Sequence, residues 1–160
     1  MSEKNSKKLT ANLSKLKINK ILIAVDKAGF KDKIISYGVF LAKGSGASII
    51  AIHVLDQTAL TEIGDVFGRR VDEYKKAMKN HAQDLLAEVQ EIIEKEGIKV
   101  NTEVIGNKSL AKGIIDYAKK SGSDVIVIGT KGMTGVSKFL LGSVANSVIN
   151  HAHCPVVAVR

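Results

Sequence analysis

The chain has 160 residues, of which 45% are hydrophobic and 4% aromatic, with a single proline and a formal net charge of +8 at pH 7. This length and apolar content suit one domain with an aliphatic core, and they exclude a disordered chain; no apolar run approaches the roughly 20 residues of a membrane span. The one cysteine, Cys154, cannot form an internal disulfide, so we expect a soluble protein of the reducing cytoplasm.

The excess of positive charge is concentrated at the N-terminus. The stretch MSEKNSKKLTANLSKLKINK holds six lysines and one acid, a balance of +5 that leaves +3 for the other 140 residues. Residues 1–17 are therefore predicted to form a flexible basic tail, and residues 18–160 a single folded domain. Leu9, Leu13 and Leu16 could instead line a short helix suited to an acidic surface. Because basic patches with interleaved aromatic residues are absent elsewhere, nucleic-acid binding is not expected.

Apolar patterning predicts strands that alternate with helices. The strands are short and almost continuously apolar, as in a sheet buried on both faces. They are predicted at 20–25, 47–56, 98–105, 124–129 and 155–159. The helices carry apolar residues at three- and four-residue steps. They are predicted over 32–43 (ended by Gly44 and Gly46), 71–96 (ended near Gly97), around 114–118, and over 143–152, with a long polar loop at 57–70. This alternation predicts an α/β fold: a single doubly wound, Rossmann-like domain with a five-stranded parallel sheet and helices on both faces.

The fold also predicts where a ligand would bind. In an open parallel sheet, ligands lie beyond the carboxyl ends of the strands, where the strand order reverses. Asp26 follows the first strand and Val54 lies near the end of the second. A glycine-rich loop runs from Gly129, at the end of the fourth strand, to Gly142, where the last helix begins. We expect these three segments to surround a crevice.

The glycine-rich loop has the composition of an anion site. Gly129, Gly132 and Gly142 let main-chain amides approach a ligand without interference from Cβ, and Lys131 adds charge. Ser143 is predicted to be the N-cap of the last helix, whose dipole favours an anion at that end. The alternative is that the glycines only serve turns that need a positive φ. Neither the P-loop pattern G-x-x-x-x-G-K-[ST] nor the dinucleotide pattern G-x-G-x-x-G occurs in the chain.

The spacing that does occur is G-x-x-G-x9-G-[ST], from Gly129 to Ser143. Together with ILIAVD near the start, IIAIHVLD in the second strand and GSVANSVINHAHCPVVAVR at the end, it resembles the universal stress protein family over residues 18–160. In that family the motif belongs to the subgroup that binds ATP or AMP. The resemblance therefore implies a cytoplasmic, adenine-nucleotide-binding regulator of the stress response.

The resemblance also implies roles for individual residues. Ribose and phosphates would be bound by Gly129, Gly132, Gly142 and Ser143, with the Val144 amide at the helix start. Asp26 would accept hydrogen bonds from the ribose hydroxyl groups. Val54 would offer main-chain groups to the adenine edge, and Ala24 would line the base pocket. Mg²⁺ or Mn²⁺ could accompany the phosphates. The segment 106–114 is longer than is usual in the family, so no contact is assigned to it.

The family forms homodimers, commonly through antiparallel pairing of the last strands. Residues 155–159, PVVAV, suit this role, because an exposed apolar edge strand is a hazard unless it is paired. A dedicated enzyme is not expected beyond slow ATP hydrolysis, because phosphoryl transfer needs a group that positions water and a well-held metal ion. The alternative function is a non-catalytic protein-interaction scaffold of the same fold that does not depend on nucleotide.

Three other candidate sites involve histidine or cysteine. The pattern His151, His153, Cys154 lacks a convincing fourth ligand for a metal ion. Cys154 has no recognisable base beside it that would make it a nucleophile. His53, inside the second strand, is predicted to be a hydrogen-bonded core histidine.

Overall fold

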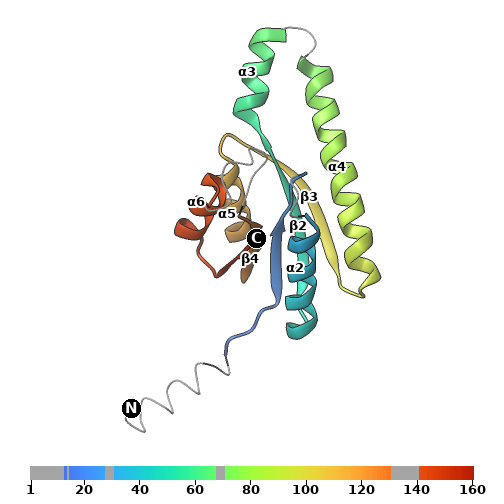
Figure 1. The fold of residues 1–160 in the computed structure, drawn as a ribbon, viewed down its shortest axis with the longest axis vertical. Coiled ribbons are helices and arrows are strands. Elements are labelled where there is room, and N and C mark those ends of the chain that lie inside the picture. Colours follow the sequence, from blue (N-terminus) through green and yellow to red (C-terminus); the bar gives the residue numbers. More distant parts are fainter. Residues whose placement is uncertain (1–12, 14, 28–30, 68–70, 131–140) are drawn as a thin grey trace.

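The computed structural model describes residues 13, 15–27, 31–67, 71–130 and 141–160. Within them, five parallel strands form one sheet in the order β3-β2-β1-β4-β5 (Figure 1). The elements are β1 (Lys20–Ala24), α2 (Lys31–Ser45), β2 (Ser48–Asp56), α3 (Gln57–Phe67), α4 (Val71–Lys95), β3 (Val100–Asn107), α5 (Leu110–Ser121), β4 (Val125–Gly129), α6 (Ser143–His151) and β5 (Val156–Val159). This confirms the predicted single α/β domain with a five-stranded parallel sheet.

Helices cover both faces of the sheet, as predicted. Side chains of a strand point alternately to its two faces. Ile21 and Ile23 of β1 pack into a core with residues of α2 and α4, whereas Leu22 and Ala24 pack into a second core with residues of α5 and α6. Both cores consist of aliphatic side chains, which agrees with the low aromatic content of the chain.

The prediction of a polar loop at 57–70 is wrong for residues 57–67, which form helix α3. Asp56, the last residue of β2, supplies the cap: its Oδ1 accepts the main-chain N–H groups of Thr58 at 2.9 Å and Ala59 at 3.1 Å. With α4, this helix forms a hairpin that extends beyond the sheet (Figure 1). The buried residues of α4 all lie from Ala82 onward, so the sheet packs only against its C-terminal part.

Glycines lie at or just after the C-terminal ends of α2 and α4, but one of the predicted positions is wrong. Gly44 was expected to end the first helix but lies inside α2, which continues to Ser45. The chain turns at Gly46, whose φ of 73° is a left-handed conformation that glycine adopts at little steric expense. Gly97, with φ of 75°, ends the region of α4 as predicted.

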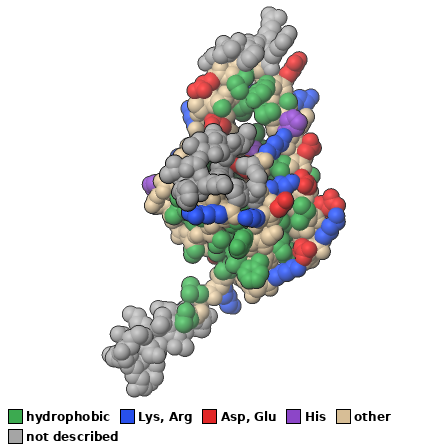
Figure 2. Space-filling view, in the orientation of Figure 1, with side chains coloured by type: hydrophobic (Ala, Val, Ile, Leu, Met, Phe, Trp, Pro, Cys, Tyr) green, Lys and Arg blue, Asp and Glu red, His purple; other side chains and the backbone are tan. Residues whose placement is uncertain are grey.

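Charges of both signs are mixed along the outer edge of the molecule, where α2 and α4 lie side by side (Figure 2). Lys31 of α2 pairs with Glu88 of α4 at 2.6 Å, and Lys43 pairs with Glu96 just after α4 at 2.5 Å. These exposed pairs contribute little to stability individually. They agree with the sequence-based view that the folded part of the chain is close to charge balance.

No helix in the described ranges is long and apolar enough to cross a membrane. The predicted basic tail, residues 1–17, lies largely outside the described residues, so its flexibility stays a prediction.

Candidate functional site

The strand order of the sheet reverses between β1 and β4. The chain runs from β1 to β2 and β3 on one side of β1, then crosses to β4 and β5 on the other side. This reversal is where open parallel sheets bind ligands. Ala24, the last residue of β1, pairs with Ile52 of β2 on one side and Ile128 of β4 on the other. Its exposed fraction is 9%, so Ala24 is buried at the point where the strand order reverses.

Asp26 lies two residues beyond Ala24, just after the end of β1. The preceding residue, Val25, is fixed to β2 by its N–H, which donates to the carbonyl of Ile52 at 3.0 Å. The Val25 carbonyl lies 2.9 Å from the imidazole Nδ1 of His53. Asp26 itself is half-buried, and α2 begins five residues later at Lys31, so Asp26 is not the N-cap of that helix. Asp26 therefore follows an anchored stretch of backbone at the carboxyl end of β1.

Val54 presents main-chain groups on the same side. Along a strand, main-chain N–H and C=O groups of alternate residues point the same way. Ile52 directs its carbonyl toward β1, where it accepts from Val25, so Val54 directs its N–H and C=O the same way, two residues further along. Because β1 ends at Ala24, these groups of Val54 face the space above β1 near Asp26. A donor and an acceptor side by side can read the edge of a base.

The end of β4 and the start of α6 are held together by the main chain. The N–H of Gly142 donates to the carbonyl of Thr130 at 2.7 Å, and the N–H of Thr130 donates to the carbonyl of Val159 in β5 at 2.8 Å. These two bonds close the base of the glycine-rich loop against the sheet. Lys131 and Gly132 belong to residues 131–140 and lie outside the described part of the chain.

The prediction that Ser143 caps the last helix is wrong by one residue. Ser143 is the first helical residue of α6, and Gly142 is the N-cap, without a side-chain cap hydrogen bond. The first intrahelical bond runs from the N–H of Asn146 to the carbonyl of Gly142 at 2.9 Å. The N–H groups of Ser143, Val144 and Ala145 therefore have no acceptor within the helix, which is how helix N-termini bind anions.

Thr130 is a member of this site that sequence analysis did not single out. Its side chain is 5% exposed, and its main chain joins Gly142 and Val159 through the two bonds given above. The available signal was its place inside the G-x-x-G motif, directly after Gly129. Its role depends on main-chain geometry, which residue type alone does not reveal.

The other candidate side chains lie elsewhere. The Nδ1 of His151, in the last turn of α6, lies 2.9 Å from the carbonyl oxygen of Ser147, one turn earlier. Among the described residues, no group of three or more His, Cys, Asp or Glu side chains could hold a metal ion. Burial, together with the nearby Asp124 carboxylate, raises the pKa of the Cys154 thiol, which disfavours the nucleophilic thiolate. His53 is hydrogen-bonded, as predicted, but it is only half-buried and does not belong to the core.

The chain matches known proteins over most of its length. The model of the universal stress protein family matches residues 17–160. A universal stress protein of Methanocaldococcus jannaschii is 33% identical over 141 residues, covering 88% of this chain and 81% of that protein. Universal stress protein UspA from Lactobacillus plantarum has a similar structure, with a TM-score of 0.77 and 25% identity over 91% of this chain and 99% of that one. The fold is shared with a universal stress protein from Archaeoglobus fulgidus solved in complex with dAMP, with a TM-score of 0.64, 23% identity, and coverage of 91% and 100%. The chain therefore belongs to the universal stress protein family.

Proposed function

We propose that the chain binds an adenine nucleotide, ATP or AMP, at the carboxyl ends of β1 and β4 and acts as a regulator in the stress response. The observation that carries this proposal is the Gly142–Thr130 main-chain bond of 2.7 Å, which fixes the N-terminus of α6 beside the end of β4. In this proposal, the start of α6 supplies the anion site, and Asp26, which follows the neighbouring strand β1, lies on the other side of the nucleotide. The G-x-x-G-x9-G-S spacing and membership of the family support the same function, and the Archaeoglobus relative of this fold was solved with dAMP.

Each part of the nucleotide has a proposed partner. The phosphates would be bound around the start of α6 and along the loop, by Gly129, Lys131, Gly132, Gly142, Ser143 and Val144. Asp26 would accept hydrogen bonds from the ribose hydroxyl groups, because an ionised carboxylate is a strong acceptor. The main chain of Val54 would face the base, whose pocket Ala24 would line. No residue is assigned a catalytic role.

Mg²⁺ or Mn²⁺ would arrive with the phosphates of ATP. The described ranges contain no cluster of acidic, histidine or cysteine ligands that would form a cage for such an ion. The cation would take most of its ligands from phosphate oxygens and water, as Mg²⁺ commonly does. We further propose a cytoplasmic homodimer formed through residues 155–159.

Titration calorimetry with ATP and AMP tests the proposal. We expect wild-type protein to bind at micromolar concentrations. Gly132→Val places a branched side chain in the phosphate path and should abolish binding. Asp26→Asn keeps the size of the side chain but removes its charge, which should weaken binding roughly 10-fold, since a hydrogen bond to a charged group contributes about 1.5–3 kcal/mol.

Asp32→Asn is the matched control, because it removes an exposed carboxylate from the first turn of α2. It should leave affinity unchanged. A flat titration of folded wild-type protein with both nucleotides would contradict the proposed function.

A protein-interaction scaffold is the second candidate, and one observation favours it. Tyr37 and Phe40 of α2 are 50% and 72% exposed. Large apolar side chains on a helix surface are typical of protein contacts. If this is the main function, a partner bound by wild-type protein should also be bound by Gly132→Val and lost in Phe40→Ser. Nucleotide dependence of the interaction would instead favour the first proposal.

A further inference from the structure

Helix α5 approaches the end of β2 unusually closely at Gly113. A Cβ atom added to Gly113 would lie 3.0 Å from the Cγ1 atom of Val54 and 3.0 Å from the Cβ atom of Asn107. Ordinary contacts between carbon atoms are 3.5–4.0 Å, so the added methyl group would push both neighbours. The position of the Val54 side chain therefore depends on the absence of a side chain at residue 113.

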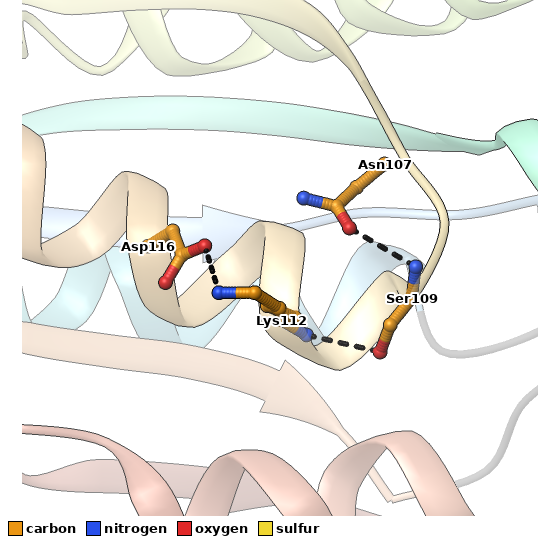
Figure 3. A network of polar contacts seen from close by, with 4 residues as sticks. All are labelled: Asn107, Ser109, Lys112 and Asp116. Atoms are coloured by element: carbon orange, nitrogen blue, oxygen red, sulfur yellow. Dashed lines mark hydrogen bonds and ion pairs between the residues drawn. The ribbon is translucent and has the colours of Figure 1, made fainter.

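Asn107 is poorly placed to yield. It is the last residue of β3, and its Oδ1 accepts the N–H of Ser109 at 3.0 Å (Figure 3). Ser109 caps α5: its Oγ accepts the N–H of Lys112 at 3.3 Å, and its carbonyl accepts the N–H of Gly113 at 2.9 Å. The turn that joins β3 to α5 is thus tied to the first turn of the helix. Pressure from residue 113 would fall mainly on Val54.

The end of β2 is also held by β3, the neighbouring strand, and by the turn that follows β3. A Cβ atom at Gly106 of β3 would lie 2.6 Å from the Nε2 atom of Gln57, the first residue of α3. The Oγ1 of Thr58 donates to the carbonyl of Lys108 at 3.2 Å. The Thr58 bond and the pairing of β2 with β3 up to Asp56 hold β2 in register, so we expect the strand to resist sliding along its axis. A push at Val54 would tilt its main chain relative to β1.

We propose that Gly113 is a positioning residue for the base subsite, which sets the direction of the Val54 main-chain N–H and C=O above β1. This inference rests on the proposed nucleotide function and deepens it. A main-chain donor beside a main-chain acceptor matches adenine, which presents a ring-nitrogen acceptor next to an amino donor. Hypoxanthine presents the reverse, a ring N–H next to a carbonyl oxygen. The geometry at Gly113 therefore controls discrimination between 6-amino and 6-oxo purines.

The test compares AMP with IMP, which share ribose and phosphate and differ in the base, by titration calorimetry on full-length protein. Wild-type protein should bind AMP at least 10-fold more tightly than IMP. In Gly113→Ala, the affinity for AMP should fall about 5- to 20-fold while that for IMP changes less than 2-fold. Val54→Ile extends the same contact from the opposite side and should shift the ratio in the same direction, which keeps the proposal testable if Gly113→Ala does not fold.

Gly44→Ala is the matched control. Gly44 also lies inside a helix, but an added Cβ would meet no atom within 4 Å. Both substitutions replace a helical glycine by alanine, but only the one at residue 113 creates close contacts, with Val54 and Asn107. Gly44→Ala should keep the AMP-to-IMP ratio of wild type.

The outcomes separate the two claims. If wild-type protein binds neither nucleotide, the proposed function fails and the inference with it. If wild-type protein prefers AMP, and both Gly113→Ala and Val54→Ile keep that preference, only the inference is overturned. Equal binding of AMP and IMP by wild type, or an equal loss of both in Gly113→Ala, would also overturn it.

Discussion

The imidazole Nδ1 atom of His53 lies 2.9 Å from the carbonyl oxygen of Val25, the residue before Asp26. A carbonyl oxygen only accepts hydrogen bonds, so Nδ1 carries the proton in this contact. A side chain from β2 thus holds the backbone just before Asp26, the proposed ribose ligand. This bond links the stability of the sheet to the geometry of the candidate site.

His53→Ala should weaken AMP binding about 3- to 10-fold, because the loop that carries Asp26 loses one of its two anchors to β2. It should also lower the free energy of unfolding by about 1 kcal/mol, the usual net contribution of such a bond. Calorimetric titration and urea unfolding measure the two effects. His81→Ala, on the exposed face of α4, is the control and should change neither quantity. Unchanged AMP affinity in folded His53→Ala would show that the bond does not position Asp26.

Among the carboxylates at the opposite end of the sheet, Asp124 should be the one whose removal lowers the free energy of unfolding most. Its Oδ2 accepts the main-chain N–H groups of Asn19 at 2.8 Å and Lys20 at 3.0 Å, which fixes the start of β1 beside β4. Asp124→Ala should lower the free energy of unfolding by about 2–3 kcal/mol, because two donors lose a charged acceptor. Asp116→Ala is the matched control.

Asp116 pairs with Lys112 one turn away on the exposed face of α5, at 2.8 Å. Such a pair contributes about 0.3–0.5 kcal/mol, so the control should be nearly neutral. Urea unfolding curves with unchanged slopes would make the comparison clean. Equal losses in the two variants would contradict the assigned role of Asp124.

Tyr117 should titrate at strongly alkaline pH. Burial raises its pKa to about 12, and the hydrogen bond of its hydroxyl to Glu103 acts in the same direction, as does the negative charge of Glu103. The unfolded chain has a tyrosine pKa of about 10. Between these values the unfolded state holds fewer protons than the folded state, so the free energy of unfolding falls as pH rises from about 10 to 12. Below this window the contribution of Tyr117 is fully present and does not change with pH.

The difference in absorbance at 295 nm between wild type and Tyr117→Phe isolates this group from Tyr37 and Tyr74. Its midpoint should lie near pH 12. In Glu103→Gln the midpoint should move down but stay above 10, because burial, the larger cause, remains. A midpoint near 10 in wild type would show that the hydroxyl is not buried against Glu103.

Sequence patterns predicted the strands and their helical partners because buried parallel strands are continuously apolar and their crossover helices are amphipathic. Helix α3 was missed for a specific reason. Gly64 and Gly68 and many polar residues suggested a loop, whereas Asp56 carried the contrary signal of an N-cap directly after β2. The half-buried Leu60 and Ile63, three residues apart, were the second signal.

Sequence patterns indicate at which edge of the sheet a site is expected, but not its main-chain detail. The fold rule placed Asp26, Val54 and the glycine-rich loop at one edge of the sheet, and the structure brings the described members of these segments together there. The cap was assigned to Ser143 because serine is preferred at N-caps. In the structure the N-cap is Gly142, and its N–H donates to the carbonyl of Thr130. A main-chain bond of this kind, like the close approach at Gly113, depends on the distance between elements and leaves no pattern in residue types.

The free edge of β5 leads to the last prediction. The carbonyl groups of Pro155 and Val159 accept from β4, from Ile126 at 3.0 Å and Thr130 at 2.8 Å. By alternation, the main-chain groups of Val156 and Ala158 point away from the sheet. Since β5 is at the edge of the described sheet, these groups are available to a second copy.

If residues 155–159 form the proposed dimer, wild-type protein should have about twice the chain mass of 17.1 kDa in light scattering. Ala158→Pro removes one outward N–H and should yield a monomer, while the bonds from β5 to β4 remain, because proline is tolerated on edge strands. Ala158 is exposed, so Ala158→Ser keeps the N–H and serves as the control. A dimer that survives Ala158→Pro would place the interface elsewhere, and the exposed Tyr37 and Phe40 of α2 would then be the next surface to test.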